Sequence, residues 1–284
     1  MTTNEDPSKF YEFTEVEKDV FRAHVYATGN QSSAKAAYGG LIESQALAAA
    51  EQTVSSDFKP HSLHIYFILN VDTAQPVDYR VRRVRDGRSF CTRVVEAVQN
   101  GAVASVLQAS FHVVEPDSCV HQSPFPVVEK LPEDCQEHHV PGHDKMPWIF
   151  DFRCTDEAAF GGLKDGMPEK LLTWMRIRHP INENDERLHR WLLLFMSDSG
   201  PGGSSVSPHM GKGFRMSQFF VLDQMTYFHR HKVRADEWML YELEPHYAGA
   251  GRGSTRGRLW SRDGELLASV TQECMVRSKG VSRL

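Results

Sequence analysis

A strand-like phrase occurs once in each half of this chain, and that duplication limits the folds that the chain can adopt. The sequence reads ASVLQA at residues 104–109 and ASVTQE at residues 268–273. Each copy follows a pair of the kind that closes a β-hairpin, Asn100-Gly101 or Asp263-Gly264. Recurrence at nearly constant separation indicates two similar modules in tandem.

Three further matches occur in the same order in both halves. They are the pairs Tyr66-Phe67 and Tyr227-Phe228, the arginines Arg93 and Arg256, and the glutamines Gln108 and Gln272, the last with one residue of drift. Chance can produce one such match, but an ordered series indicates an internal duplication.

Each half combines one helix-like run with several strand-like runs. Residues 41–54 and 182–200 have helical patterns, the first built on Ala and Leu and the second with Asn184 as the expected N-cap. Alternating, β-branched segments fill residues 61–114 and 218–276. We therefore predict an α+β fold in which each module wraps an antiparallel sheet around a central helix, and in which the modules join edge strands.

A change of composition separates the modules. Residues 116–147 are rich in Pro, acidic residues and His and show little periodicity, which is typical of a linker. We assign residues 1–115 to an N-terminal module and residues 148–284 to a C-terminal module that ends in a targeting tail.

Composition and charge exclude several classes of protein. The net charge is −5 over 284 residues without a long basic block, so we expect no nucleic-acid partner. The longest apolar run, residues 191–196, is far shorter than the ~20 residues of a membrane span. The N-terminus lacks the apolar core of a secretory signal. Five scattered cysteines without a Cys-x-x-Cys pair indicate a reducing compartment.

Several segments together resemble the type II acyl-CoA thioesterases, a family with bacterial TesB-like and peroxisomal members. They are YGGLIESQALAAA, HSLHIYF, RVVEAVQNG, LDQMTYFH and ASVTQE, within a resemblance that extends over about residues 21–276. The resemblance implies a double hotdog fold and hydrolysis of fatty acyl-CoA to free fatty acid and CoA by direct attack of an activated water. We expect no cofactor and no metal site.

The resemblance also assigns the reaction centre. The family's catalytic Asp falls on Asp198 and its water-holding Gln on Gln272. A carboxylate at a helix C-terminus meets the negative end of the helix dipole, which raises its basicity. The family's Thr or Ser falls on Val221, which has no hydroxyl. The water would then be held by Asp198 and Gln272 alone, or also by a displaced hydroxyl such as Ser217 or Thr226.

Glycines and arginines are the candidates for substrate binding. Backbone amides at the helix start, near Gly39 and Gly40, are expected to hold the thioester oxygen, although a simple tight turn explains these glycines as well. Arg252 and Arg256 suit the phosphates of CoA, although charges on a solvated strand face are the commoner explanation. The first helix has Glu43 near its start and no counterpart of Asp198 at its end, so we expect one active site, in the second half.

Two alternative functions remain open from the sequence alone. Val221 motivates a non-catalytic acyl-CoA-binding protein. An enoyl-CoA hydratase usually needs a closely spaced Asp and His, whereas His209 follows Asp198 across a Gly-rich stretch, GPGGSS, that we expect to be a mobile loop. No Gly-x-Ser-x-Gly motif of an α/β-hydrolase occurs.

The remaining motifs concern metals, targeting and assembly. Cys135 lies near three histidines, but the spacing matches no familiar zinc pattern; the histidines are His138, His139 and His143. The C-terminal Ser282-Arg283-Leu284 resembles a peroxisomal address, which predicts a peroxisomal location and binding to the import receptor. The sequence leaves the oligomeric state open, with a homo-oligomer as one option.

Overall fold

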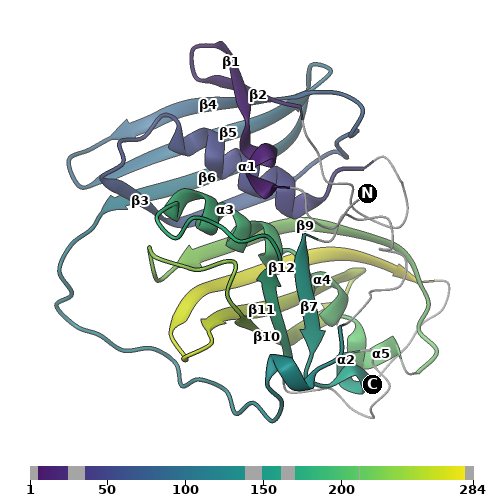
Figure 1. The fold of residues 1–284 in the computed structure, drawn as a ribbon. Helices are drawn as coiled ribbons and strands as arrows, with labels where there is room; N and C mark the ends of the chain where they lie inside the picture. Colours follow the sequence, from purple (N-terminus) through teal and green to yellow (C-terminus); the bar gives the residue numbers. More distant parts are fainter. Residues whose placement is uncertain (1–5, 25–35, 138–148, 161–169, 211, 279–284) are drawn as a thin grey trace.

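One continuous antiparallel sheet of twelve strands runs through the described part of the chain (Figure 1). The structure is a computed structural model that describes residues 6–24, 36–137, 149–160, 170–210 and 212–278. The strand order is β1-β2-β4-β5-β6-β3-β9-β12-β11-β10-β8-β7. The first six strands in this order come from the N-terminal half and the last six from the C-terminal half.

The two halves have the same order of elements. The N-terminal half contains β1 (Phe13–Glu17), β2 (Val20–Ala23), α1 (Gly39–Glu51), β3 (Phe58–Phe67), β4 (Val77–Asp86), β5 (Phe90–Gln99) and β6 (Ala102–Val113). The C-terminal half contains β7 (Phe150–Cys154), β8 (Leu171–Ile177), α3 (Glu186–Ser197), β9 (Met216–Phe228), β10 (Met239–Gly249), β11 (Arg252–Ser261) and β12 (Leu266–Ser278). Short helical turns complete the described elements: η1 (Pro7–Tyr11), η2 (Pro132–Asp134), α2 (Glu157–Phe160), α4 (Pro201–Ser204) and α5 (Ser207–Met210). The predicted duplication and α+β class are confirmed, whereas the sequence patterns did not reveal β1, β2 and β7.

The seam between the halves is the pair β3–β9. Its register runs from Ser62 opposite Tyr227 to Tyr66 opposite Asp223. Pairing these two strands removes two exposed edges, as expected for a fused pair of modules. The predicted joining of edge strands is therefore confirmed.

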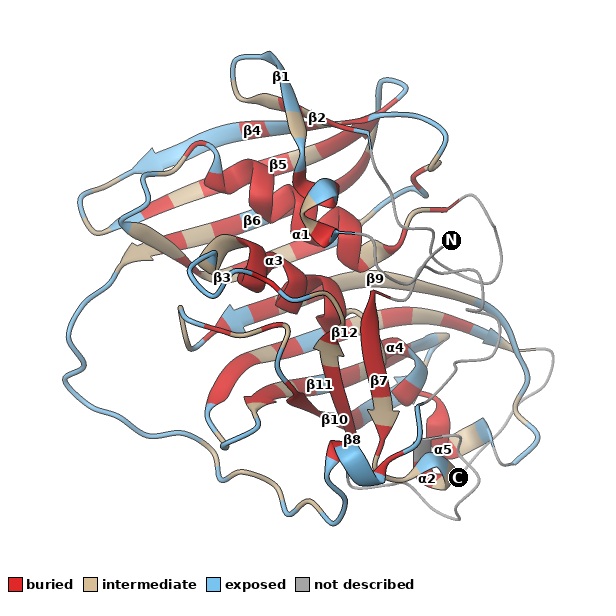
Figure 2. Ribbon diagram, viewed as in Figure 1, coloured by how far each residue is buried: buried red, intermediate tan, exposed pale blue. Residues whose placement is uncertain are grey.

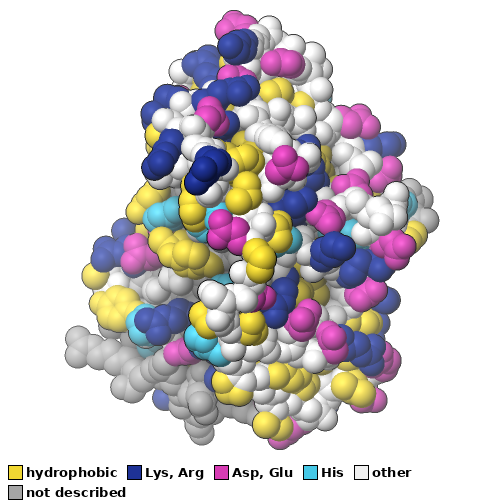
Figure 3. Space-filling model, turned by 90° about the vertical axis from the view of Figure 1, so that its left-hand side faces the viewer, with side chains coloured by type: hydrophobic (Ala, Val, Ile, Leu, Met, Phe, Trp, Pro, Cys, Tyr) yellow, Lys and Arg dark blue, Asp and Glu magenta, His cyan; other side chains and the backbone are white. Residues whose placement is uncertain are grey.

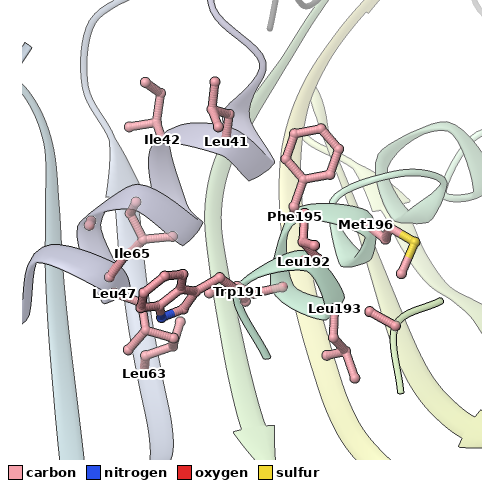
Figure 4. Close-up of a cluster of buried hydrophobic side chains, with 14 of the residues drawn as sticks. Leu41, Ile42, Leu47, Leu63, Ile65, Trp191, Leu192, Leu193, Phe195 and Met196 are labelled. Carbon is pink, nitrogen blue, oxygen red and sulfur yellow. The ribbon is translucent and has the colours of Figure 1, made fainter. Parts of the chain in front are cut away.

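The two long helices pack against each other and against the sheet. Every residue of α1 from Gly40 to Glu51 is buried (Figure 2), and four of its alanines have no exposed surface. Small side chains let α1 lie close to β4, β5 and β6 while it also contacts α3. Figure 4 shows apolar side chains of both helices beside Leu63 and Ile65 of β3.

The contacts at the helix ends show that α1 and α3 run antiparallel. Glu51, the last residue of α1, accepts hydrogen bonds from Arg190 and Trp191 in the first half of α3. At the other end, the start of α1 lies beside the residue that follows α3. Each helix therefore presents its C-terminal end to the N-terminal part of the other.

Two local expectations for the second helix region were wrong. The N-cap of α3 is Asp185, whose carboxylate accepts from the Leu188 amide, and not Asn184. The stretch expected to be a mobile loop forms the single turn α4, in which Pro201, Gly202 and Ser204 are buried. The turn packs against β10, β11 and β12.

The predicted linker packs on the C-terminal half of the sheet. The indole N–H of Trp174 donates to the Lys130 carbonyl at 2.9 Å, and Phe125 and Cys135 join a second apolar cluster with Trp174 and Trp260. The segment therefore covers a sheet face as well as joining the modules. The module boundaries at residues 115 and 147 stay predictions.

One face of the molecule shows how the surface charges are distributed. On the face in Figure 3, basic and acidic side chains are interspersed. Among the described residues, no helix combines the length and apolar character needed to cross a membrane.

Candidate active site

Asp198 lies where the end of α3, the start of α1 and strand β12 meet. It is the C-cap of α3. Its Oδ2 accepts a hydrogen bond from the Gly40 amide at 2.8 Å, and its Oδ1 accepts one from Gln272 Nε2 at 2.8 Å. Asp198, Gln272 and the predicted glycines of α1 are thus brought together, although Gly40 and Asp198 are 158 positions apart in the chain.

Glycine at position 40 is required by the approach of α1 to α3. A Cβ built on Gly40 would overlap the Phe195 carbonyl oxygen and lie 3.0 Å from the Asp198 Cβ. A side chain would therefore push the first turn of α1 away from Asp198. The glycine pair that resembled a simple turn serves a close helix-to-helix contact.

The Asp198 carboxyl group has a raised pKa. Burial raises this pKa from its ordinary value of 3.8 to about 6, and the hydrogen bonds from Gly40 and Gln272 partly oppose the rise. The prediction of raised basicity agrees with this direction, but desolvation is the main cause. At neutral pH the group is a carboxylate that readily accepts a proton.

Gln272 faces inward from β12 and is buried. Its Nε2 donates to Asp198 and also to Gln224 Oε1 at 2.7 Å. Its Oε1 is buried and has no hydrogen-bond partner among the described residues. A buried amide oxygen in this condition is a ready acceptor for a water molecule.

Gln224, on β9 opposite Gln272, is a site residue that sequence reasoning missed. Its Nε2 donates to Glu43 Oε2 at 2.7 Å and to Ser197 Oγ at 2.9 Å. Positions 224, 226 and 228 of β9 are buried in alternation. A polar Gln224 in line with Thr226 and Phe228 was the signal that could have identified it.

Val221, where we expected the family's hydroxyl, faces the same side of the sheet as Gln272. A bulge in β9 moves the register by one residue, so Val221 pairs with the buried Cys274. Of the two candidate hydroxyls, Ser217 is exposed and Thr226 is buried. The Thr226 Oγ1 has no hydrogen-bond partner among the described residues, so Thr226 does not supply a displaced hydroxyl that bonds to Asp198.

The two arginines predicted for CoA are not brought to this site. Arg252 and Arg256 are exposed on β11, whereas Thr255 between them is buried opposite Gln272. Arg252 pairs with Glu273 at 3.1 Å. Because successive residues of a strand point to opposite faces, both arginines face away from Asp198. Their assignment to CoA phosphates stays a prediction that this placement does not support.

The duplicated sequence pairs do not occupy equivalent faces. Gln108 is exposed on β6, whereas Gln272 is buried on β12. Arg93 and Ala109 form a buried pair between β5 and β6, and Thr255 and Gln272 form the corresponding buried pair between β11 and β12. The one residue of drift therefore places Ala109, and not Gln108, at the position equivalent to Gln272.

Two other described candidates raised by the sequence, His209 and Cys135, are not part of this hydrogen-bonded group. His209 lies in α5, and the described hydrogen bonds to Asp198 come from Gly40 and Gln272. Cys135 is buried against tryptophans, and the described residues contain no group of three or more metal ligands. The histidines His138, His139 and His143 and the tail Ser282-Arg283-Leu284 lie outside the described residues.

Comparison with known families covers most of the chain. Residues 28–112 match the model of the acyl-CoA thioesterase N-terminal domain, and residues 132–276 match that of the acyl-CoA thioesterase C-terminal domain. The chain belongs to the type II acyl-CoA thioesterase family. Two domain models in tandem agree with the duplication that the strand order shows.

Individual relatives support this membership. Acyl-coenzyme A thioesterase 8 of Rattus norvegicus is 34% identical over 93% of this chain and 86% of its own length. Acyl-CoA thioesterase 2 of Haemophilus influenzae is 30% identical over 84% of this chain and 87% of its own length. Both matches span the two halves of this thioesterase-family chain.

Solved structures confirm the double hotdog fold. Acyl-CoA thioesterase II TesB2 from Mycobacterium marinum has a TM-score of 0.80 and 30% identity, over 97% of this chain and 99% of that one. A protein with a hot dog fold from Alicyclobacillus acidocaldarius has a TM-score of 0.80 at 18% identity, over 98% and 100% of the two chains. The second likeness concerns the fold alone.

The turn α4 gives a direct test of the site geometry. A Cβ on Gly202 would overlap the Phe219 ring and lie 3.1 Å from Gln272 Oε1, whereas a Cβ on Gly203 would meet nothing within 4 Å. We predict that Gly202→Ala lowers kcat for acyl-CoA hydrolysis by about tenfold or more, because a displaced catalytic group loses its orientation. Gly203→Ala, in the same turn, serves as the control and should retain the kcat of the parent enzyme. Equal kcat values for the two variants would contradict the placement of Gln272 Oε1 beside α4.

Proposed function

We propose that this protein hydrolyses acyl-CoA to the free acid and CoA, with Asp198 as the general base. The observation that carries the proposal is a buried carboxylate with a pKa of about 6, hydrogen-bonded to an amide whose oxygen is unengaged among the described residues. A base with a pKa just below the working pH is ionised and still accepts a proton effectively. Relatives named acyl-CoA thioesterases support the choice of substrate class.

A water molecule between Asp198 and Gln272 would be the nucleophile. The Asp198 carboxylate accepts one of its protons, and Gln272 Oε1 accepts a hydrogen bond from the other. The oxygen lone pair then points at the thioester carbonyl carbon. The new carbon–oxygen bond forms as the proton moves to Asp198, which gives a tetrahedral intermediate.

The oxygen of this intermediate needs a hydrogen-bond donor, and the first turn of α1 supplies amides. The amides of Gly40, Leu41 and Ile42 already donate to Asp198 or to the Tyr38 carbonyl. We therefore assign the oxyanion contact to Gly39. The intermediate then expels the CoA thiolate, which takes up the proton held by Asp198.

Val221 lacks the hydroxyl that the family resemblance leads one to expect at this position. Gln272 is nevertheless held by a hydrogen bond to a neighbouring strand. Gln224 Oε1 bonds the Gln272 amide at 2.7 Å. Asp198 and Gln272, the two groups that would hold the water, are therefore kept in place without a hydroxyl as a third group. This arrangement favours a working hydrolase over a protein that only binds acyl-CoA.

The hydratase alternative has less support. Its chemistry needs a histidine near the acid, whereas the described hydrogen-bond partners of Asp198 are an amide N–H and a carboxamide. His209 instead lies close to Phe214.

Replacing Asp198 tests the proposed base. We predict that Asp198→Asn lowers kcat by about 10²–10⁴-fold, the usual contribution of a general base, measured as thiol release from medium- and long-chain acyl-CoA. Because the reactive form is the carboxylate, kcat/KM of the parent enzyme should rise with pH through about 6, the pKa of Asp198, and level off above it. The control is Asp223→Asn, which removes a carboxylate paired with His64 at the β3–β9 seam. Unchanged turnover by Asp198→Asn, or activity that increases as the pH falls through the Asp198 pKa, would sink the proposal.

We further propose that the protein is peroxisomal and binds the import receptor through Ser282, Arg283 and Leu284. A shorter match, 36% over 95 residues and 32% of this chain, is to the peroxisomal acyl-coenzyme A thioester hydrolase 1 of Saccharomyces cerevisiae. A fluorescent protein fused to the N-terminus should report peroxisomal localisation that disappears when the last three residues are deleted. The same distribution with and without these residues would refute the assignment.

A further inference from the structure

A run of buried polar side chains continues inward from Asp198, beyond the groups that the proposed reaction uses. The order is Gln272, Gln224 and then Glu43 with Ser197, and each side chain is at most 1% exposed. The run joins β12 and β9 to both central helices. Burying polar groups costs free energy unless their hydrogen bonds are made. The donor-to-acceptor direction of each hydrogen bond in the run is therefore informative.

Ser197 fixes the direction of the run. Its hydroxyl donates to the Leu194 carbonyl at 2.8 Å, so its oxygen is the acceptor toward Gln224. The amino group of Gln224 therefore points at Ser197 and Glu43. The carbonyl oxygen of Gln224 must then face Gln272, where it accepts from Nε2.

The orientation of Gln272 follows from that of Gln224. Its amino group lies between two acceptors, Gln224 Oε1 and Asp198 Oδ1. A flipped carboxamide would place Oε1 against both acceptors, which is repulsive in a buried site. Gln272 Oε1 is consequently the atom left for the attacking water.

Glu43 completes this arrangement as a neutral acid. Burial raises the pKa of its carboxyl group well above the ordinary value, and the Asp198 charge raises it further. The other titratable groups that interact with it are the phenols of Tyr38 and Tyr241, whose pKa values are also raised, chiefly by burial. None of these neighbours is a cation, so the protonated form is favoured and Asp198 holds the charge of the cluster.

We propose that Glu43, as the neutral acid, is a positioning residue that acts through Gln224 to hold the Gln272 carbonyl oxygen toward the attacking water. The proposal rests on the proposed hydrolysis by Asp198. Glu43 itself touches neither the water nor the acyl group. Its effect is transmitted by the hydrogen bonds Glu43–Gln224 at 2.7 Å and Gln224–Gln272 at 2.7 Å.

The test compares Glu43→Met with Glu43→Gln. Methionine removes the acceptor for Gln224, so we expect kcat to fall by about tenfold with little change in KM, the loss expected for one orienting hydrogen bond. Glutamine keeps a neutral acceptor of the same shape and should recover most of the lost kcat. Because Glu43 holds no charge in the parent enzyme, Glu43→Gln should not move the midpoint of the pH profile.

Gln45→Met is the matched control. Gln45 is equally buried on α1 but bonds the Phe10 carbonyl and the Tyr79 hydroxyl, away from Asp198. This variant should lower the melting temperature without lowering kcat. It separates a general effect on the packing of α1 from the specific effect of Glu43.

Gln224→Met provides a second route that does not depend on Glu43→Met being folded. It should lower kcat by a similar factor, and the double variant Glu43→Met/Gln224→Met should be no slower, because both changes break the same connection. Losses that multiply in the double variant would overturn the connection.

Three other outcomes overturn the positioning role: parent-like kcat in Glu43→Met, a kcat in Glu43→Gln as low as in Glu43→Met, or a lower pH midpoint in Glu43→Gln. The last would show that Glu43 carries charge and had raised the pKa of Asp198. Loss of activity in Asp198→Asn together with normal kcat in Glu43→Met refutes only the positioning role. Full activity in Asp198→Asn refutes the proposed function instead.

Discussion

The hydrogen bond from the Gly40 amide to the Asp198 carboxylate is the contact on which the site depends. It joins the N-terminal half of the chain to the C-terminal half, and it forms only because α1 and α3 pack antiparallel at very short range. Gly40 permits this short distance between the helices, since any side chain there would collide with α3. The β3–β9 seam holds the two helices in this relation, so the continuous sheet serves the site as well as stability.

The pseudo-symmetry of the two halves creates a second helix junction of the same kind, and the chain uses it differently. We expected no acid at the end of the first helix, but Glu51 closes α1 as Asp198 follows α3. Glu51 forms a buried ion pair with Arg190 and accepts from Trp191, whereas Asp198 lies among neutral donors. Both carboxylate oxygens of Glu51 are therefore engaged by α3, one by the Arg190 guanidinium and the other by the Trp191 indole N–H. One junction is thus a structural ion pair, and the other keeps a reactive carboxylate.

The sequence predicted the architecture well because the fold rests on local patterns. The Asn100-Gly101 turn has both residues at positive φ, as its hairpin signal requires, and the alternation of apolar residues marked the strands. Asp198 and Gln272 came from the family resemblance. The equivalence of Gln108 and Gln272 was wrong because a shift of one residue in a strand reverses the face. Gln224 was missed, and so was its contact with Glu43, because the two residues are 181 positions apart and no local pattern reports such a contact.

The proposed reaction depends on Asp198 being a buried carboxylate whose pKa is raised to about 6. The most direct measurement is a carbon-13 NMR titration of protein labelled at the aspartate carboxyl carbon, with Asp198→Asn used to assign the resonance. We expect one aspartate that titrates with a pKa of about 6 and whose resonance disappears in the variant. An Asp198 resonance that titrates near the ordinary pKa of 3.8 would contradict it.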